Sequence, residues 1–310
     1  MKATAKPKAS RLRTGLQFRR HWQKHLMLLP MLVILFIFCY IPMSGLVMAF
    51  QNYLPSKGYF GSPWAGLDWF RYMFRMQNFT SVVWNTLFLS LLKLATGLFC
   101  SVLFALLLNE IRAKWLRSGI QSMVLFPFFV SWVVLADIVK DMASEEGVLN
   151  QVISALTGHT IPFLINDKWF IVLLAVSNIW KEVGYNAIIV LAALTAINPA
   201  LYEAATIDGA SRLQQIRYVT LPGISQIVAM LLILALGGVM NGGFDQIYNL
   251  YNTTVMSSVD IIDTYVYRVG VNGGLYSLGT AVGLFKSVVG AILLLLSYKA
   301  ADKWAGYRIF

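Results

Sequence analysis

Long apolar runs separated by short polar segments dominate the chain. Each run has about the 20 residues that a helix needs to cross the hydrocarbon core of a bilayer. The pattern predicts six membrane-spanning helices, at Leu26–Phe50, Val82–Asn109, Gly119–Val139, Trp169–Ile197, Gly223–Asn241 and Leu278–Tyr298. We therefore expect an all-α, polytopic membrane protein whose transmembrane domain comprises residues 26–300. A basic segment, residues 1–25, precedes this domain, and a short tail, residues 301–310, follows it.

The composition supports a membrane protein and excludes two other classes. Of the 310 residues, 58% are hydrophobic and only 13% are charged. Soluble domains contain roughly a quarter charged residues, and disordered chains are much less apolar. The two cysteines, Cys39 and Cys100, lie within apolar runs, where such residues usually pack as small apolar side chains. A disulfide scaffold is therefore not expected.

Lys and Arg are distributed unevenly among the connecting segments. The formal net charge is +11, and most of the 25 Lys and Arg residues lie before the first predicted span or after the second, fourth and sixth. Loops that stay in the cytoplasm carry an excess of these residues. The sequence therefore predicts that both termini are cytoplasmic. In so apolar a chain, the basic excess points to a membrane surface rather than to nucleic acid.

One predicted cytoplasmic loop, residues 198–222, carries folding signals of its own. Asn198 can cap a helix that begins at the following proline, and Gly209 tolerates the positive φ that often ends a helix. Ser211 can cap a second short helix, which we expect Pro222 to stop where the fifth span begins. An ordinary amphipathic loop helix would give the same periodicity. The loop carries a small-residue face, Ala204, Ala205 and Ala210, between the charged residues Glu203, Asp208, Arg212 and Arg217.

The loop resembles the EAA loop of binding-protein-dependent ABC importer permeases. The matching residues are Glu203-Ala-Ala205, Asp208-Gly-Ala210 and Leu221-Pro222. Further matches extend over most of the chain from about residue 80 onward, at Asn85-Thr86, Leu106–Glu110, Ile261–Val266 and Ala281–Ser287. These segments are most similar to the carbohydrate, maltose-type class, in its subgroup for large or acidic oligosaccharides. Leu213 and Ile216 depart from the pattern, because the family often has an aromatic residue there.

The resemblance implies a division of labour among subunits. This chain would form half of an oligosaccharide pathway with a second, homologous permease in a bacterial cell membrane. An extracellular or periplasmic solute-binding protein would deliver the substrate, and two ATPase subunits would bind ATP and Mg²⁺. The chain itself is not expected to be an enzyme or to bind a cofactor, and it contains no Gly-Lys dipeptide for a phosphate-binding Walker A loop. An ion-driven secondary sugar carrier is the alternative.

The resemblance also assigns roles to the loop at residues 198–222. Its helices would dock on the ATPase subunits and convert their closure into motion of the spans. The residues implied in this coupling are Glu203, Ala204, Ala205, Asp208, Gly209, Ala210, Arg212, Arg217 and Pro222.

Several ionisable residues lie within the predicted spans. Each costs at least about 2.5–3.5 kcal/mol at the membrane centre, so such residues usually face a cavity or a partner. In the fourth span, Lys181 and Tyr185 share one helix face. Glu182 and Asn186 share the neighbouring face. A structural ion pair with another span is the alternative to substrate contact.

Polar groups beside aromatic rings suit a sugar, because its hydroxyls need hydrogen-bond partners and its ring faces stack on aromatic side chains. The segment Asn241–Gln246, with its two glycines, is a second place where a broken backbone can line a cavity. The candidate substrate-path residues are Trp180, Lys181, Glu182, Tyr185, Asn186, Asn241, Asp245 and Lys93. If the cargo is anionic, Lys181 and Lys93 are candidates to pair with its carboxylates.

Overall fold

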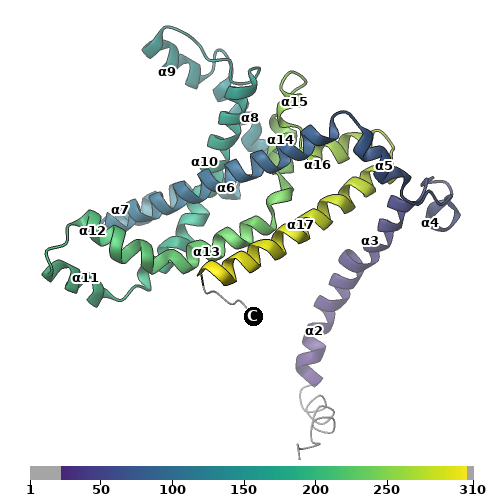
Figure 1. Cartoon of the computed structure of the whole chain (residues 1–310). Helices are drawn as coiled ribbons and strands as arrows, with labels where there is room; N and C mark the ends of the chain where they lie inside the picture. Colours follow the sequence, from purple (N-terminus) through teal and green to yellow (C-terminus); the bar gives the residue numbers. More distant parts are fainter. Residues whose placement is uncertain (1–21, 306–310) are drawn as a thin grey trace, which may run out of the picture.

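The structure, a computed structural model, describes residues 22–305 and is built from helices (Figure 1). The predicted all-α class is confirmed. Within the described residues, four segments are long and apolar enough to span a membrane: Trp22–Phe50, Phe79–Glu110, Arg212–Gly237 and Tyr276–Lys299. Two helix pairs, bent by 105° and 70°, bring the number to the predicted six if each pair crosses once. Parts of the predicted terminal segments, residues 1–21 and 306–310, lie outside the described residues.

The helices follow one another along the chain with short connections. The first half comprises α2 (Trp22–Leu35), η1 (Phe36–Tyr40), α3 (Ile41–Met43), η2 (Ser44–Phe50), α4 (Gly58–Gly61), α5 (Asp68–Arg75), α6 (Phe79–Glu110), α7 (Lys114–Phe129), α8 (Trp132–Ala143) and α9 (Val148–Thr157). The second half comprises α10 (Asp167–Thr195), α11 (Pro199–Ile207), α12 (Arg212–Gln215), η3 (Ile216–Thr220), α13 (Leu221–Gly237), η4 (Val239–Asn241), α14 (Phe244–Leu250), α15 (Met256–Val259), α16 (Ile262–Tyr265), η5 (Val266–Asn272) and α17 (Tyr276–Ala305).

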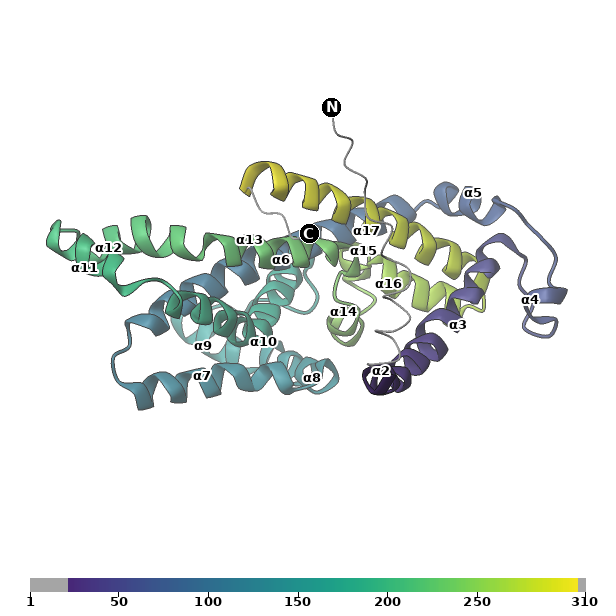
Figure 2. The same ribbon diagram turned by 90° about the horizontal axis from the view of Figure 1, so that it is seen from below.

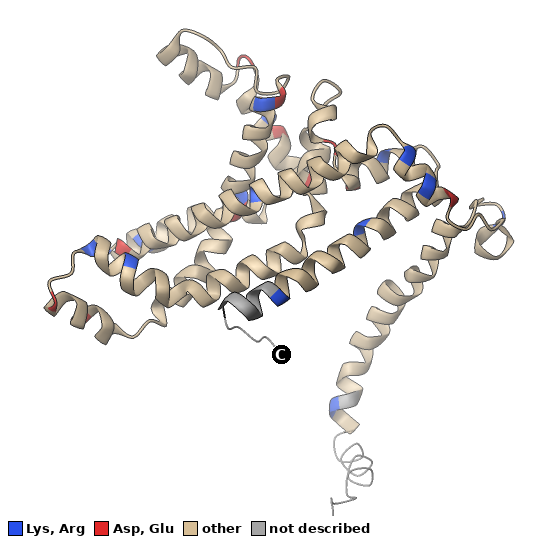
Figure 3. Ribbon diagram, viewed as in Figure 1, with Lys and Arg blue, Asp and Glu red and all other residues tan. Residues whose placement is uncertain are grey.

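The long helices lie side by side, so their termini form the two ends of the bundle. α10 packs against both α6 and α7, and α13 packs against α17 (Figures 1 and 2). α2 and α3 extend away from this bundle. Charged residues gather towards the ends of the long helices, whose middle parts carry few of them (Figure 3). This distribution is what a membrane requires, since its hydrocarbon core does not solvate charges.

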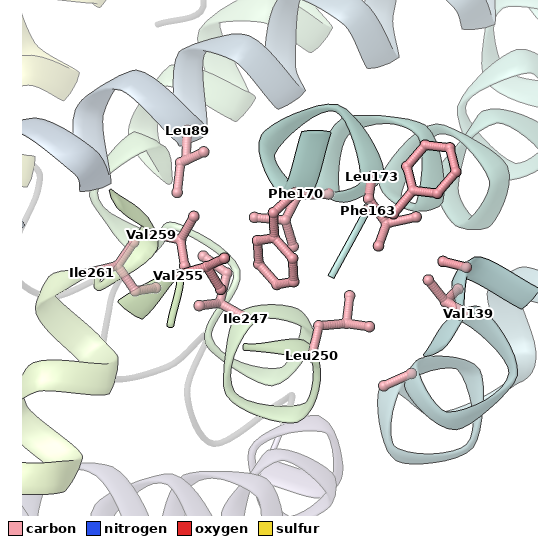
Figure 4. Close-up of a cluster of buried hydrophobic side chains, with 13 residues drawn as sticks. Leu89, Val139, Phe163, Phe170, Leu173, Ile247, Leu250, Val255, Val259 and Ile261 are labelled. Carbon is pink, nitrogen blue, oxygen red and sulfur yellow. The ribbon is translucent and has the colours of Figure 1, made fainter. Parts of the chain in front are cut away.

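The largest cluster of buried side chains joins α6, α8, α10, α14 and α15 (Figure 4). Phe170 of α10 lies in this cluster and is fully buried. Large apolar side chains such as Phe99 and Leu234 are instead exposed on the outside of the bundle. An apolar exterior around a small packed core is expected where lipid rather than water surrounds the helices.

The third predicted span, Gly119–Val139, is not one continuous helix, and the prediction is wrong on this point. α7 ends at Phe129 and α8 begins at Trp132, at an angle of 105° between the two bent segments. The Ser131 hydroxyl accepts a hydrogen bond from the Val134 N–H and so caps α8. The apolar run continues through this elbow, so apolar length alone did not reveal it.

The loop at residues 198–222 forms the predicted capped helix pair. The Asn198 side chain accepts a hydrogen bond of 3.0 Å from the Ala200 N–H, and Gly209 has a φ of +78°. Ser211 and Gln214 form a reciprocal capping box at the start of α12.

Pro222 does not stop the second helix of this loop, so that prediction is wrong. The helix continues from Arg212 to Gly237. A proline inside a helix lacks an N–H and meets the carbonyl four residues earlier. The π-helical turn η3 precedes Pro222, and the Leu221 N–H bonds across it to the Ile216 carbonyl. We infer that this wider turn accommodates the proline.

We predict that Gly184→Ala weakens the packing of α10 on α7. A Cβ at this position would overlap the Val124 carbonyl oxygen, so the two helix backbones would have to separate. The expected loss of unfolding free energy is about 1–3 kcal/mol, measured by denaturation of the purified protein in detergent. Gly283→Ala is the control, because nothing lies within 4 Å of its added Cβ. Equal stability of the two variants would contradict the close approach.

Candidate functional site

α6, α10 and α13 line a partly open cavity of about 270 Å³, whose mainly apolar wall carries several polar side chains. On α10, Asn178, Glu182 and Asn186 line it at intervals of four residues, so one helix face points to the cavity. α6 contributes residues at similar spacing, and the end of α13 and its following turn complete the wall. These remaining residues are Ser90, Lys93, Leu94, Gly97, Leu98, Leu231, Ala235, Gly238, Val239, Asn241, Gly242 and Gly243.

Lys93 is the cationic residue of this cavity. Its side chain is buried, with 8% of the residue exposed, and its Nζ donates a hydrogen bond of 2.9 Å to the Gly242 carbonyl oxygen. An ammonium group has three N–H donors. Among the residues that the structure describes, no carboxylate oxygen lies within the 4.0 Å of an ion pair with Lys93.

The carbonyl that Lys93 contacts belongs to a break in the backbone. After η4, Gly242 and Gly243 adopt left-handed conformations with φ of +41° and +84°, and α14 begins at the next residue. Residues with a side chain rarely adopt a positive φ, whereas glycine does so freely. A Cβ at Gly243 would also lie 2.9 Å from Lys93 Nζ. The glycine pair therefore turns the chain and leaves room for the ammonium.

The structure brings together four of the eight candidate substrate-path residues. Lys93, Glu182, Asn186 and Asn241 line the cavity. Trp180, Lys181, Tyr185 and Asp245 do not belong to its lining.

Two polar residues of the cavity, Ser90 and Asn178, were not predicted from the sequence. Asn178 lies one helical turn before Glu182, so extending that polar stripe by four residues would have identified it. Ser90 gives no such signal, since a serine in an apolar helix usually bonds to its own backbone.

Lys181 lies on the side of α10 that faces α7. Its buried ammonium donates to the carbonyl oxygens of Phe128, at 2.9 Å, Pro127, at 3.3 Å, and Val130. The Trp132 ring centroid lies 5.6 Å from the same nitrogen. These carbonyls belong to the carboxyl end of α7 and the elbow that follows, where a cation is electrostatically favoured. The partners of Lys181 are thus backbone oxygens rather than the acidic group of the ion-pair alternative.

Tyr185 lies beside Lys181 and contacts the same elbow. Its ring stacks on Phe128 with centroids 4.4 Å apart. This aromatic pair therefore holds α10 against α7 and is not directed into the cavity.

Two ion pairs lie near the break after η4. Lys286 of α17 pairs with Asp263 of α16 at 2.6 Å, which gives a partner to the third lysine of the predicted spans. Arg268 and Asp260 form a two-pronged pair, with 3.1 Å between Nη1 and Oδ1. Hydrogen bonding to Asp260 raises the pKa of Arg268 above its ordinary value.

A second hollow, of about 760 Å³, lies between the end of α6 and the capped loop. Hydrogen bonds stiffen the loop around it. The Tyr202 hydroxyl lies 3.0 Å from Thr220 Oγ1, and the Gln215 amide donates to Thr206 Oγ1 at 3.0 Å. Glu203, Ala210 and Arg212 are among its lining residues.

The capped loop exposes large apolar side chains as well as charged ones. Ile207 is 86% exposed and Leu213 is 75% exposed. A rigid loop with exposed apolar side chains has the character of a protein interaction surface.

Residues 97–306 match the family described as "Binding-protein-dependent transport system inner membrane component". The chain is 41% identical over 287 residues to a polygalacturonan/rhamnogalacturonan transport system permease protein, YteP, of Bacillus subtilis (strain 168), which covers 92% of this chain and 89% of the relative. It is equally similar to protein LplB of that organism, with 41% identity over 92% of this chain and 90% of the relative.

Solved structures show the same fold. The chain superposes with a TM-score of 0.86 and 38% identity on a chain of a bacterial ABC transporter involved in the import of the acidic polysaccharide alginate. The match covers 94% of this chain and 99% of that chain. A second structure, of the alginate transporter in complex with a periplasmic protein bound to alginate pentasaccharide, also matches with a TM-score of 0.86.

We predict that Lys181→Met destabilises the protein, because it removes the donor from three carbonyls at the elbow. Leaving such buried acceptors unpaired costs about 1–3 kcal/mol, measured as the unfolding free energy in detergent. Lys168→Met, at an exposed position of the same helix, is the control and should change stability by less than about 0.5 kcal/mol. A Lys181→Met protein as stable as the control would show that the elbow does not depend on this ammonium.

Proposed function

The chain belongs to the family of binding-protein-dependent transport system inner membrane components, and we propose that it serves an ATP-driven importer of acidic oligosaccharides. It is a multi-pass permease subunit of the ABC importer type. The single observation that carries the substrate class is the superposition over 94% of the chain on a chain of an alginate importer. The name of the polygalacturonan/rhamnogalacturonan relative supports the same class, since both polymers contain uronic acids.

The cavity between α6, α10 and α13 is the proposed substrate path. Its amides and carboxyl group offer the donors and acceptors that sugar hydroxyls need, at a depth where lipid offers none. Lys93, Glu182, Asn186 and Asn241 contribute to this path, together with Asn178. A second, homologous permease would supply the other half.

The capped loop at residues 198–222 is the proposed docking site for a separate ATPase subunit. Its hydrogen-bonded helices form a rigid unit that continues directly into α13. A displacement of this unit would therefore also move α13, which lines the cavity. Glu203, Ala204, Ala205, Asp208, Gly209, Ala210, Arg212, Arg217 and Pro222 are the proposed coupling residues.

The proposed orientation places this loop and both termini in the cytoplasm. Two ATPase subunits would bind ATP and Mg²⁺ there, one against each permease. A solute-binding protein would deliver substrate at the opposite end, which carries α5 and α15 (Figure 1). An ion-driven secondary carrier needs neither partner, so uptake by the purified chain without them would favour that alternative.

We predict that Glu203→Lys uncouples transport from ATP hydrolysis. Glu203 is exposed, so the substitution leaves the fold intact while reversing the charge of the proposed docking surface. ATP-driven uptake by the reconstituted transporter should fall at least about tenfold, or 1.4 kcal/mol. Gly209→Pro should act alike, because proline cannot adopt the φ of +78° found there.

The control for this experiment is Glu145→Lys, an exposed charge reversal beside α8, far from the loop along the chain. It should leave ATP-driven uptake and the ATP hydrolysis rate unchanged. If Glu203→Lys and Gly209→Pro support normal uptake, the loop is not the coupling element.

We also predict that the reconstituted transporter takes up acidic oligosaccharides in preference to neutral ones. Trigalacturonate and maltotriose are suitable probes, compared as initial rates of ATP-dependent uptake into proteoliposomes with the binding protein present. Trigalacturonate should be taken up at least about tenfold faster, which corresponds to 1.4 kcal/mol. Equal rates, or a preference for maltotriose, would refute the acidic class.

A further inference from the structure

The buried ammonium of Lys93 has an incomplete set of partners. Of its three N–H donors, one bonds to the Gly242 carbonyl oxygen at 2.9 Å. Burying a charge is costly unless the charge is paired. Within the described residues, the buried ammonium of Lys181 donates to three carbonyl oxygens, and Lys286 forms an ion pair with Asp263. Lys93 therefore keeps donors for a partner that enters its cavity.

A second unused donor lies one helical turn away on the same face of α6. Ser90 Oγ is buried and has no hydrogen-bond partner among the described residues. Other hydroxyls of α6 donate to the carbonyl four residues earlier, as Thr86, Thr96 and Ser101 do. Ser90 and Lys93 both line the cavity, at the i and i+3 positions that share one helix face.

These two donors fit the chemistry of a carboxylate. A carboxylate accepts hydrogen bonds on both oxygens, and its bonds to an ammonium are about twice as strong as bonds between neutral groups. The acidic residue of the same cavity, Glu182, does not supply this partner, since it forms no ion pair with Lys93. A ligand that carries its own negative charge would complete this set of partners.

We propose that Lys93 and Ser90 form a subsite for the carboxylate of one uronate unit of the transported oligosaccharide. The Gly242 carbonyl acts as the positioning group, because it holds the ammonium beside the cavity. This inference rests on the proposed function and adds the place where this chain recognises the charge of its cargo.

The glycine pair sets the geometry of the subsite. A Cβ at Gly243 would lie 2.9 Å from Lys93 Nζ, so any larger residue displaces the ammonium. A Cβ at Gly242 would instead lie closest to Ile261, at 2.7 Å. The carboxylate subsite thus depends on the backbone break that follows η4 as well as on the two side chains of α6.

The direct test compares two ligands of the same shape and different charge. The complete transporter, with its partner permease, ATPase subunits and binding protein, is reconstituted with this chain as wild type or as Lys93→Met. Initial uptake is measured for trigalacturonate and for its fully methyl-esterified, neutral form, each at a saturating concentration of loaded binding protein. Taking the ratio of variant to wild type for each ligand cancels any preference of the binding protein.

The subsite predicts that Lys93→Met lowers trigalacturonate uptake at least tenfold more than uptake of the ester. Ser90→Ala should also lower trigalacturonate uptake more than ester uptake, but by a smaller factor than Lys93→Met. Lys181→Met is the matched control, because its ammonium is occupied by carbonyls, and it should lower both rates by the same factor. Equal losses for the two ligands in Lys93→Met would overturn the subsite.

A second comparison uses trigalacturonate alone and so does not depend on transport of the ester. Lys93→Arg keeps the positive charge, so its rate of trigalacturonate-stimulated ATP hydrolysis should stay within about threefold of the wild-type rate. In Lys93→Met the same rate should fall at least about tenfold. Similar rates for the two variants would overturn the subsite. If the wild-type transporter takes up the ester but not the acid, the proposed function itself is wrong and the subsite is rejected with it.

Discussion

A bilayer offers no hydrogen-bond partners, and this constraint determines where polar groups can lie in the bundle. Lys181 meets it by donating to backbone carbonyls at the end of α7. Lys286 meets it with a carboxylate of α16. Lys93 bonds to one carbonyl and otherwise faces the cavity. The three lysines thus stabilise an elbow, pair two helices and line a cavity, depending on the groups that lie beside each of them.

The same elements connect the cavity to the rest of the molecule. α10 contributes its polar stripe on one side and its lysine and glycine contacts with α7 on the other. α13 lines the cavity and continues without interruption from the capped loop at the far end. A displacement of the loop would therefore move one wall of the cavity, while the packing of α10 on α7 keeps another wall in place. This arrangement is what an importer driven from one end requires.

Apolar length was enough to predict the all-α class and the approximate positions of the four continuous spans, because a bilayer imposes one dominant requirement on sequence. They could not predict the elbow before Trp132, since the apolar run continues through it. Pro222 lies inside a helix because the preceding turn widens, which no local signal reports. The roles of Lys93 and Lys181 depend on backbone carbonyls that are distant in the sequence. The residues next to each lysine give no sign of these contacts. Glu182 and Asn186, which the sequence places on one helix face, both line the cavity.

The most direct test of the central claim is whether the cavity is a water-filled path that the substrate occupies. In a transporter with Cys39 and Cys100 replaced by alanine, Asn178→Cys should react with a water-soluble maleimide and be protected by trigalacturonate. Val176→Cys, exposed on the same helix outside the cavity lining, should resist labelling with or without the sugar. Equal labelling at the two positions, or no protection at position 178, would contradict the path.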